Sequence, residues 1–199
     1  MGSKDTPYSN GAFMFDLYCD DSYPNNPPKM SITTTGGGKI RFNPNLYSCG
    51  KVCLSLLGTW RGQASENWDA KLSTLLQLFI STQGITMSED VYFNEPGFDS
   101  EQGTVEGDKK NEGYSNIVRL GNVRYAMNGQ LKNPPKGFEE IIKKHFYIKK
   151  KEIIEEVSKW IENADKKSAE YSGLVNDHNS SWCSELKASK GKYKELLMK

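Results

Sequence analysis

Two short segments near the amino end alternate apolar and polar side chains with the period of a β-strand. In residues 12–18, Phe13, Phe15 and Leu17 fall on one side, which predicts a strand with one face toward a core. Residues 23–28, YPNNPP, include three prolines, which lack a backbone donor and exclude a paired strand. We expect a rigid turn there and a second strand over residues 29–34. The chain therefore begins with a small antiparallel sheet.

After residue 70 the apolar positions take the spacing of a helix. Residues 72–88 predict a buried helix that ends at Gly84. The glycine- and acid-rich residues 90–113 predict turns, and a second helix is expected from Ser115 to Gly129, with Lys132–Pro135 after its end. The face expected to be buried on the first helix carries Leu72, Leu75, Leu76, Phe79, Ile80 and Gln83.

The carboxyl-terminal third has the most regular helical pattern of the chain. A polar break at residues 172–180 separates two helical stretches, so the whole chain reads as α+β, with the sheet first and helices afterwards. The apolar faces carry Phe138, Ile141, Ile142, His145 and Phe146, then Ile153, Ile154, Val157, Trp160 and Ile161, and in the last helix Trp182, Leu186, Ser189, Tyr193 and Leu196.

Composition and charge exclude several classes of protein. The chain has 199 residues, of which 36% are apolar and 26% charged, as in soluble globular proteins. No apolar run approaches the ~18–20 residues of a membrane span, and the amino end is unlike a signal peptide. Residues 131–199 carry 15 Lys and 11 acids, a net charge of +4, against −3 for residues 1–130. This asymmetry is too mild for a nucleic-acid-binding face. We expect neither membrane nor nucleic acid as a partner.

Nothing in the sequence predicts a metal or an organic cofactor. Gly36–Lys39 lacks the earlier glycine and the following Ser or Thr of a phosphate-binding loop. Cys49 and Cys53 have no second close pair of cysteines, and both histidines lie far downstream, which disfavours zinc. Four cysteines in a chain of this length do not form a disulfide framework. We expect reduced thiols in an intracellular protein.

Cys53 is the candidate nucleophile. An ordinary thiol, with a pKa of about 8.5, is only partly ionised near neutral pH, and no loop histidine is present to activate it as in a Cys–His protease. Exchange with a thioester needs little proton abstraction, so such a thiol still suits that substrate. The developing oxyanion then needs a donor. Asn45, which Pro44 holds eight residues before Cys53, offers a neutral amide for this purpose.

Several motifs in order resemble the core of ubiquitin-conjugating enzymes. FNPN at residues 42–45 and GKVCLSLL at 50–57 are followed by Trp60 and Trp68 before a helix. The resemblance covers about residues 5–165 and is greatest to the very large hybrid conjugating enzyme/ligases, including the apoptosis-inhibitor type. The other segments that carry it are DTPYSNGAFMFDLYCDDSYPNNPPKM, VYFNEPG and VRYAMNGQLKNPPKGFEEIIKKHF.

The resemblance implies a fold and a division of the chain. The expected fold is that of ubiquitin-conjugating enzymes, a small antiparallel meander packed on α-helices. Residues 5–165 would form the core domain and residues 166–199 a helical extension. The family's first helix and first strand, which meet the activating enzyme, are not found before Asp5, so we expect a core without them.

The resemblance also implies site residues and partners. Cys53 would form the thioester with ubiquitin, Asn45 would match the amide of the family's His-Pro-Asn motif, and Glu95 would match an acid beside the cysteine. Such a carboxylate can orient an incoming lysine and favour loss of its proton; the alternative for Glu95 is a turn or helix-capping acid. Expected partners are ubiquitin, its activating enzyme and lysine-bearing proteins, in the cytoplasm and also the nucleus.

Four residues at three places depart from the family pattern. Asn43 replaces the motif's histidine, in a role that looks structural. Asn25 and Asp69-Ala70 replace an aromatic residue and Ser-Pro that ligase-binding members carry. Contacts with RING ligases are thus expected to be weak, which favours a hybrid enzyme or an unfamiliar ligase. The alternatives are a non-catalytic variant that only binds ubiquitin, against which Cys53 argues, and a carrier of another ubiquitin-like protein.

Overall fold

The computed structural model describes residues 1–170 and 178–197, and it describes side chains for residues 1–164 and 184–197. These residues form two compact units. The hairpin unit consists of Gly2–Ser9 and Phe13–Val118, and the helical unit of Met1, Asn10–Ala12 and the chain from Arg119 onward. The boundary expected at residue 165 stays a prediction. Most of the predicted break at 172–180 lies outside the described residues.

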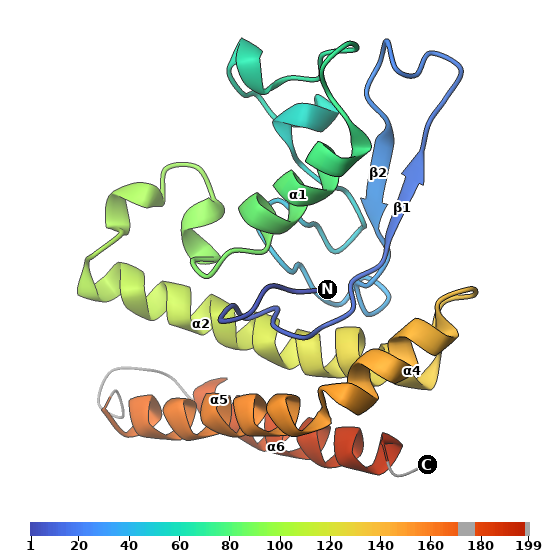
Figure 1. Cartoon of the computed structure of the whole chain (residues 1–199). Helices are drawn as coiled ribbons and strands as arrows, with labels where there is room; N and C mark the ends of the chain where they lie inside the picture. Colours follow the sequence, from blue (N-terminus) through green and yellow to red (C-terminus); the bar gives the residue numbers. More distant parts are fainter. Residues whose placement is uncertain (171–177, 198–199) are drawn as a thin grey trace. The chain divides into compact units, whose positions relative to one another are not determined.

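The hairpin unit is built around a two-stranded antiparallel sheet. Strand β1 (Phe15–Tyr18) pairs with β2 (Lys29–Ile32), with Phe15 opposite Ile32 (Figure 1). The alternation predicted for residues 12–18 is confirmed over residues 15–18, where Phe15 and Leu17 are half-buried and their neighbours are exposed. Lys51 joins β2 through an isolated bridge to Ser31. The fold is α+β, as predicted.

A compact apolar core lies beneath this sheet. Its aromatic part includes Phe13 and Phe42, whose rings meet edge to face at 5.0 Å between centroids. Such perpendicular contacts are favoured by the ring quadrupoles. The buried apolar residues of this unit include Tyr8, Ile32, Ile40, Phe42, Leu46, Val52, Leu78, Val91 and Val118.

Helix α1 (Leu75–Thr86) confirms the predicted helix, but it continues past the expected end at Gly84 and does not bury its predicted face. Thr74 and Gln77 form a reciprocal capping box at its start. The residues that face the core are Leu78, Thr82 and Thr86. Of the residues expected to be buried, Leu72, Leu76, Phe79 and Ile80 are instead 48–74% exposed, and Gln83 is exposed.

Two threonine hydroxyls explain why the polar side of α1 can be the buried one. Thr82 Oγ1 donates to Leu78 O at 2.7 Å, and Thr86 Oγ1 donates to Thr82 O at 2.6 Å. Each hydroxyl is therefore satisfied by the preceding turn, and its burial leaves no unpaired polar group. Thr82 Oγ1 also lies 3.8 Å from Met30 Sδ of β2, which places α1 beside the hairpin (Figure 1).

Helix α2 (Val105–Gly121) begins well before the predicted Ser115. The turns expected over residues 90–113 are confirmed up to Thr104, a segment that includes short 3₁₀ helices at Tyr92–Asn94 and Asp99–Glu101. The prediction was wrong beyond Thr104, whose Oγ1 accepts from Gly107 N at 3.0 Å and caps the first turn. The helical chain then runs through wider π-type turns, Asn122–Gly129, into α3 (Gln130–Lys132).

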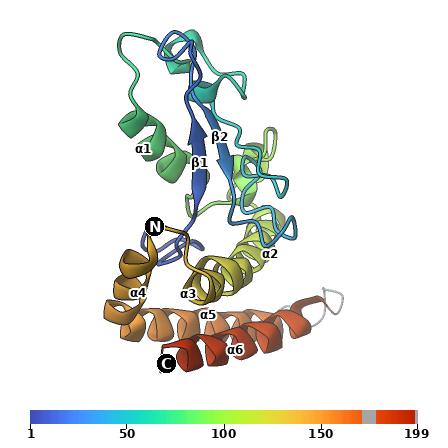
Figure 2. The ribbon, with the colours of Figure 1, turned by 90° about the vertical axis from the view of Figure 1, so that its right-hand side faces the viewer.

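The helical unit contains α4 (Glu139–Ile148), α5 (Lys150–Glu170) and α6 (His178–Leu196). Helices α5 and α6 run side by side in opposite directions (Figure 2). No described helix is both long and apolar enough to cross a bilayer. The core of the unit consists of Ala12, Val123, Met127, Ile142, Phe146, Ile153, Val157, Trp160, Ile161, Ala164, Leu186 and Tyr193.

Most of the periodicity predicted for these helices is confirmed. Buried Ser189 lies on the same face of α6 as Leu186 and Tyr193. Phe138 and Ile141 are exceptions, because both are exposed near the start of α4. The side chain of Trp182 lies outside those described.

Candidate active site

The turn Phe42–Asn45 is held by a buried network of polar side chains. Asn43 is fully buried, and its Nδ2 donates to Asn94 Oδ1 at 2.9 Å, while its Oδ1 accepts from Asn45 N at 2.8 Å. Tyr8 donates its hydroxyl to Phe42 O at 2.6 Å. Asn43 therefore supplies the structural hydrogen bonds expected of it, and it fixes the backbone of Asn45.

Cys53 is joined to the same turn through the backbone. Its N–H donates to Asn45 O at 2.9 Å, so the turn and the cysteine are held in register. Gly50, just before Cys53, allows the chain to approach β2 closely, because its φ is +96° and a Cβ there would meet Ile32 O at 3.1 Å. Cys53 is a free thiol that is only 4% exposed, whereas Cys49 is an exposed free thiol.

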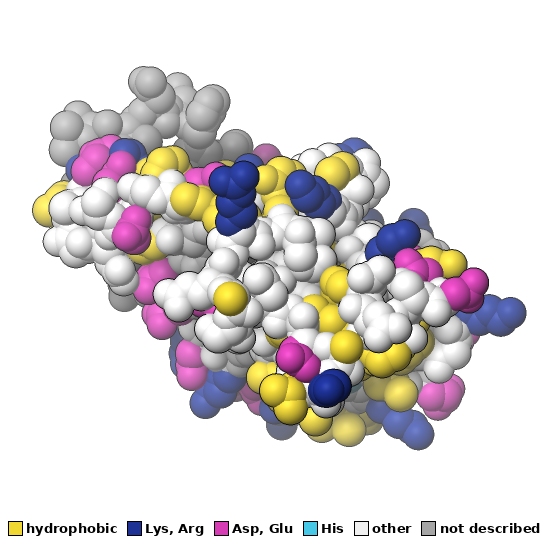
Figure 3. All heavy atoms as spheres, turned by 90° about the horizontal axis from the view of Figure 1, so that it is seen from above, with side chains coloured by type: hydrophobic (Ala, Val, Ile, Leu, Met, Phe, Trp, Pro, Cys, Tyr) yellow, Lys and Arg dark blue, Asp and Glu magenta, His cyan; other side chains and the backbone are white. Residues whose placement is uncertain are grey.

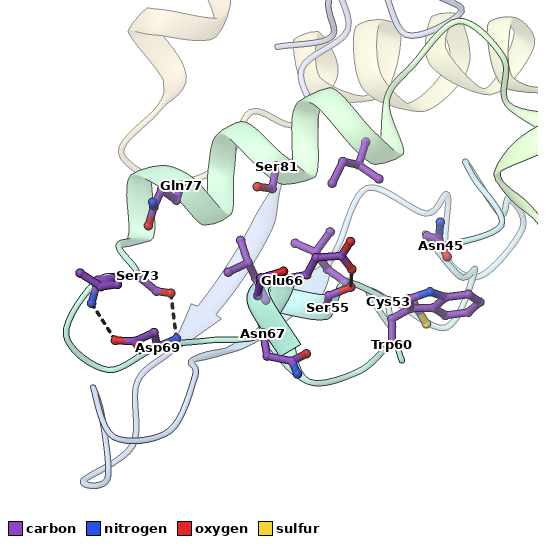
Figure 4. A pocket seen from close by; sticks show the side chains of 15 residues that line it. Asn45, Cys53, Ser55, Trp60, Glu66, Asn67, Asp69, Ser73, Gln77 and Ser81 are labelled. Atoms are coloured by element: carbon purple, nitrogen blue, oxygen red, sulfur yellow. Dashed lines mark hydrogen bonds between the residues drawn. The ribbon is translucent and has the colours of Figure 1, made fainter. Parts of the chain in front are cut away.

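Cys53 and Asn45 both line a groove of about 660 Å³ on the surface of the hairpin unit. The groove runs between the segment 53–69 and one side of α1, and Figure 4 places Asn45, Cys53 and Trp60 toward one end and Asp69, Ser73 and Gln77 toward the other. Its lining is mixed, and its only charged members are Glu66 and Asp69. The lining residues are Asn45, Cys53, Leu54, Ser55, Leu56, Trp60, Ser65, Glu66, Asn67, Asp69, Leu72, Ser73, Gln77, Ser81 and Ile85.

Glu95 is not part of this lining, but it is linked to the turn that carries Asn45. Its carboxylate lies 3.3 Å from the guanidinium of Arg41. The same guanidinium nitrogen donates to Pro44 O, and the guanidinium lies 4.2 Å from the ring centroid of Tyr47. Arg41 thus joins Glu95 to the backbone just before Asn45. Sequence reasoning missed Arg41, whose only signal is its place beside FNPN.

The two tryptophans have different positions. Trp68 Nε1 donates to Pro24 O at 2.7 Å, and its ring packs against Tyr23. Trp60 is partly exposed and lines the groove. Sequence reasoning also missed the polar residues that line the groove from α1, Gln77 and Ser81, and from the turn before it, Ser73.

Two tyrosines near the turn remain neutral donors over the physiological range. Burial raises the pKa of Tyr8 above its ordinary value, with its hydrogen bond to Asn43 opposing the change. Burial also raises the pKa of Tyr114 to about 12, opposed by the charge of Arg41. The Tyr114 hydroxyl donates to Arg41 O at 3.2 Å, which further fixes the segment that leads into the turn.

The site therefore combines a nearly buried thiol, a neighbouring amide and a groove without a histidine or another basic group in its lining. Such a site lacks the activating base of a Cys–His hydrolase. It suits a substrate that is already activated and that enters as an extended segment. The family profile described as "Ubiquitin-conjugating enzyme" matches residues 1–118.

The chain belongs to the ubiquitin-conjugating enzyme family. It is 48% identical over 177 residues to a probable ubiquitin-conjugating enzyme E2 of Acanthamoeba polyphaga mimivirus, an alignment that covers 88% of this chain and 12% of the relative. It is 40% identical over 199 residues to the human dual E2 ubiquitin-conjugating enzyme/E3 ubiquitin-protein ligase BIRC6, covering all of this chain and 4% of that protein. A probable ubiquitin-conjugating enzyme of Caenorhabditis elegans is 46% identical over 162 residues, covering 81% of this chain and 22% of the relative.

These relatives are much longer than the present chain, which matches 12% and 4% of the first two. The comparisons therefore show the family of this domain.

Proposed function

We propose that Cys53 carries ubiquitin as a thioester and passes it to a lysine of a protein substrate. The observation that carries this proposal is the groove that Cys53 and Asn45 both line and whose lining contains no histidine. A thiolate at Cys53 attacks the carbonyl carbon of the thioester on the activating enzyme. A new carbon–sulfur bond forms, the old one breaks, and the thiol of the activating enzyme leaves as a thiolate.

The second step transfers the acyl group from sulfur to nitrogen. The amine attacks the thioester carbonyl, and the carbon–nitrogen bond forms as the bond to Cys53 breaks and its sulfur leaves. Negative charge develops on the carbonyl oxygen, and the Asn45 amide is the neighbouring side chain suited to donate to it. Glu95, held by Arg41, is suited to orient the incoming ammonium and favour its deprotonation.

The shape of the hairpin unit supports binding of a modifier with an extended tail. The groove leads away from Cys53 along α1, so a tail attached to the sulfur can lie in it. Leu76, Phe79 and Ile80 of α1 are exposed beside it, and an apolar surface of this kind favours contact with a folded partner. The space-filling view shows apolar side chains among polar and charged ones on the face seen from above (Figure 3). We propose that the folded part of ubiquitin covers α1.

Hybrid character, in which the protein itself selects acceptors, is a further part of this proposal. The full-length match to a protein named as a dual E2/E3 enzyme supports it, as do Asn25, Asp69 and Ala70 at positions where ligase-binding members carry other residues. Reduced stimulation by RING ligases is the corresponding expectation. A non-catalytic ubiquitin-binding module is disfavoured by Cys53 in an intact motif.

The test is a charging assay with ubiquitin, activating enzyme and ATP, analysed on a non-reducing gel. We expect a thiol-sensitive shift in the wild type and in Cys49→Ser but none in Cys53→Ser. A shift retained in Cys53→Ser would disprove the carrier role.

Asn45→Ala separates the two steps in the same assay. We expect it to form the thioester normally and to lose lysine transfer by about 10²–10³-fold, the usual cost of one oxyanion donor. Equal loss of charging and transfer would contradict the oxyanion role and indicate that the turn itself is damaged.

A further inference from the structure

The helical unit has a second groove, which the ubiquitin-transfer site does not use. It has a volume of about 830 Å³ and lies between α3, α4 and the end of α6. Its walls are largely apolar, and two of its apolar members are strongly exposed, Tyr147 by 64% and Ile148 by 75%. The lining residues are Leu131, Lys132, Lys143, Lys144, Tyr147, Ile148, Leu196 and Leu197.

The exposure of these side chains is not explained by the packing of the unit. On the opposite side of α4, Ile142 and Phe146 are buried in the core, so the helix already has an inward face. Tyr147 and Ile148 form part of a second apolar face, turned toward the groove. A concave apolar surface of this size on a water-soluble unit is typical of a binding site.

The charged residues that line the groove are all lysines. Lys132, Lys143 and Lys144 belong to the lining, which contains no carboxylate. Lys150 adds a fourth ammonium group, 5.0 Å from the ring centroid of Tyr147. None of the ion pairs found within the described residues neutralises these four lysines. The groove therefore has an apolar floor and a cationic rim.

We propose that this groove binds a short amphipathic segment of a partner protein, with apolar side chains in the cleft and carboxylates on the rim. Charge complementarity selects an acidic segment, because burial of a basic one would place like charges together. The hollow shape and apolar floor favour inserted side chains over a flat lipid surface or a nucleic-acid backbone, which need exposed cations rather than a cleft. The surface would thus recruit acidic proteins at a place separate from the cysteine groove.

The probe for this proposal is a displayed library of random twelve-residue peptides, selected against the whole chain. We expect enriched peptides to have a net negative charge and at least two apolar residues. Their synthetic, fluorescently labelled versions should bind in a polarisation assay with an affinity that falls as salt is added, since the rim charges are exposed.

Variants of exposed groove residues test the location. Lys143→Glu with Lys144→Glu, and separately Tyr147→Ser, should each weaken peptide binding by about ten-fold or more. The matched control is Lys151→Glu with Lys159→Glu, two exposed lysines of α5 outside the groove, which should change binding by less than about two-fold. Circular dichroism of each variant checks that the fold is retained.

Three results would overturn the proposal. The first is a selection that enriches no peptide, or only peptides without net negative charge. The second is equal binding by the groove variants and the control variant. The third is binding of anionic phospholipid vesicles that the groove variants lose while no peptide binds, which would assign the surface to a membrane.

Discussion

Replacement of Asn43 by alanine tests the link between the buried polar network and the catalytic turn. Asn43 makes hydrogen bonds with three residues from separate parts of the hairpin unit: Asn94 at 2.9 Å, Asn45 at 2.8 Å and, more weakly, Tyr8 at 3.5 Å. Alanine removes all three and leaves a small void in a fully buried position. We expect both the stability and the transfer reaction to suffer.

The magnitude follows from the two short bonds. A typical hydrogen bond contributes about 1 kcal/mol net, and an abandoned buried partner adds roughly 1–3 kcal/mol. Asn94 Oδ1 keeps Ser88 Oγ at 3.5 Å as a second contact, so the penalty for the loss of its bond to Asn43 lies at the low end of this range. Asn45 N, in contrast, loses the side-chain acceptor that Asn43 provides. We therefore expect a loss of about 2–3 kcal/mol in the free energy of unfolding.

The assay is urea denaturation followed by circular dichroism, combined with single-turnover transfer from pre-formed thioester. Asn26→Ala is the matched control, because the Asn26 amide makes one exposed bond to Ser22 Oγ at 3.1 Å, and its loss should cost at most about 0.5 kcal/mol. Transfer by Asn43→Ala should fall by about ten-fold, less than for Asn45→Ala, since the amide is still present but less well positioned.

Two results would refute this reasoning. If Asn43→Ala were as stable as Asn26→Ala, the network would not hold the turn. If stability fell but transfer were unchanged under conditions where the variant is folded, the position of Asn45 would not depend on Asn43.

Three further predictions concern other parts of the molecule. Leu78→Ala, at a fully buried position, should lower the free energy of unfolding in urea by about 2–4 kcal/mol. Phe79→Ala, at an exposed position, should change that free energy by less than about 1 kcal/mol. Equal effects would mean that the other face of α1 is buried. Burial raises the pKa of Tyr8, Tyr114 and Tyr193 in the folded chain. Their contribution to stability is therefore complete below the pKa of about 10 that tyrosine has in the unfolded chain, and it declines as the pH rises above that value. Ultraviolet titration should show these phenols ionising only above pH 10 or on unfolding, and early ionisation of all tyrosines would contradict their burial. Glu95→Ala should slow lysine transfer more at pH 6.5 than at pH 9, where more of the attacking amine is already neutral; an effect independent of pH would assign Glu95 a purely structural role.

The local features of this protein could be predicted from its sequence because they depend on neighbours along the chain. Alternation of Phe13, Phe15 and Leu17 predicted strand β1, and the 3.6-residue period of Ile153, Val157, Trp160 and Ile161 predicted the buried face of α5. The ordered motifs around Cys53 predicted the family. Asn45 was placed beside Cys53 in the sequence argument, and the structure has both in one groove.

The features that could not be predicted depend on what surrounds each element. The amino acids of α1 indicate a helix, but either of two faces could pack against the core. The side with Leu78, Thr82 and Thr86 is the one that packs there, and its burial leaves no unpaired hydroxyl because both threonines bond to their own helix. Helix α2 starts early because Thr104 caps a segment whose glycines suggested turns. The contacts of Arg41 with Glu95 and Pro44 join residues that no periodicity connects.

Residue order and short-range patterns were enough to predict the kinds of elements, the family and the candidate nucleophile. Which apolar side chains remain in water, along α1 and around Tyr147 and Ile148, follows from the packing of the folded chain. The physical reason is that hydrophobic periodicity reports how much apolar surface an element carries, whereas the folded chain determines which part of that surface it covers itself and which part is left for a partner.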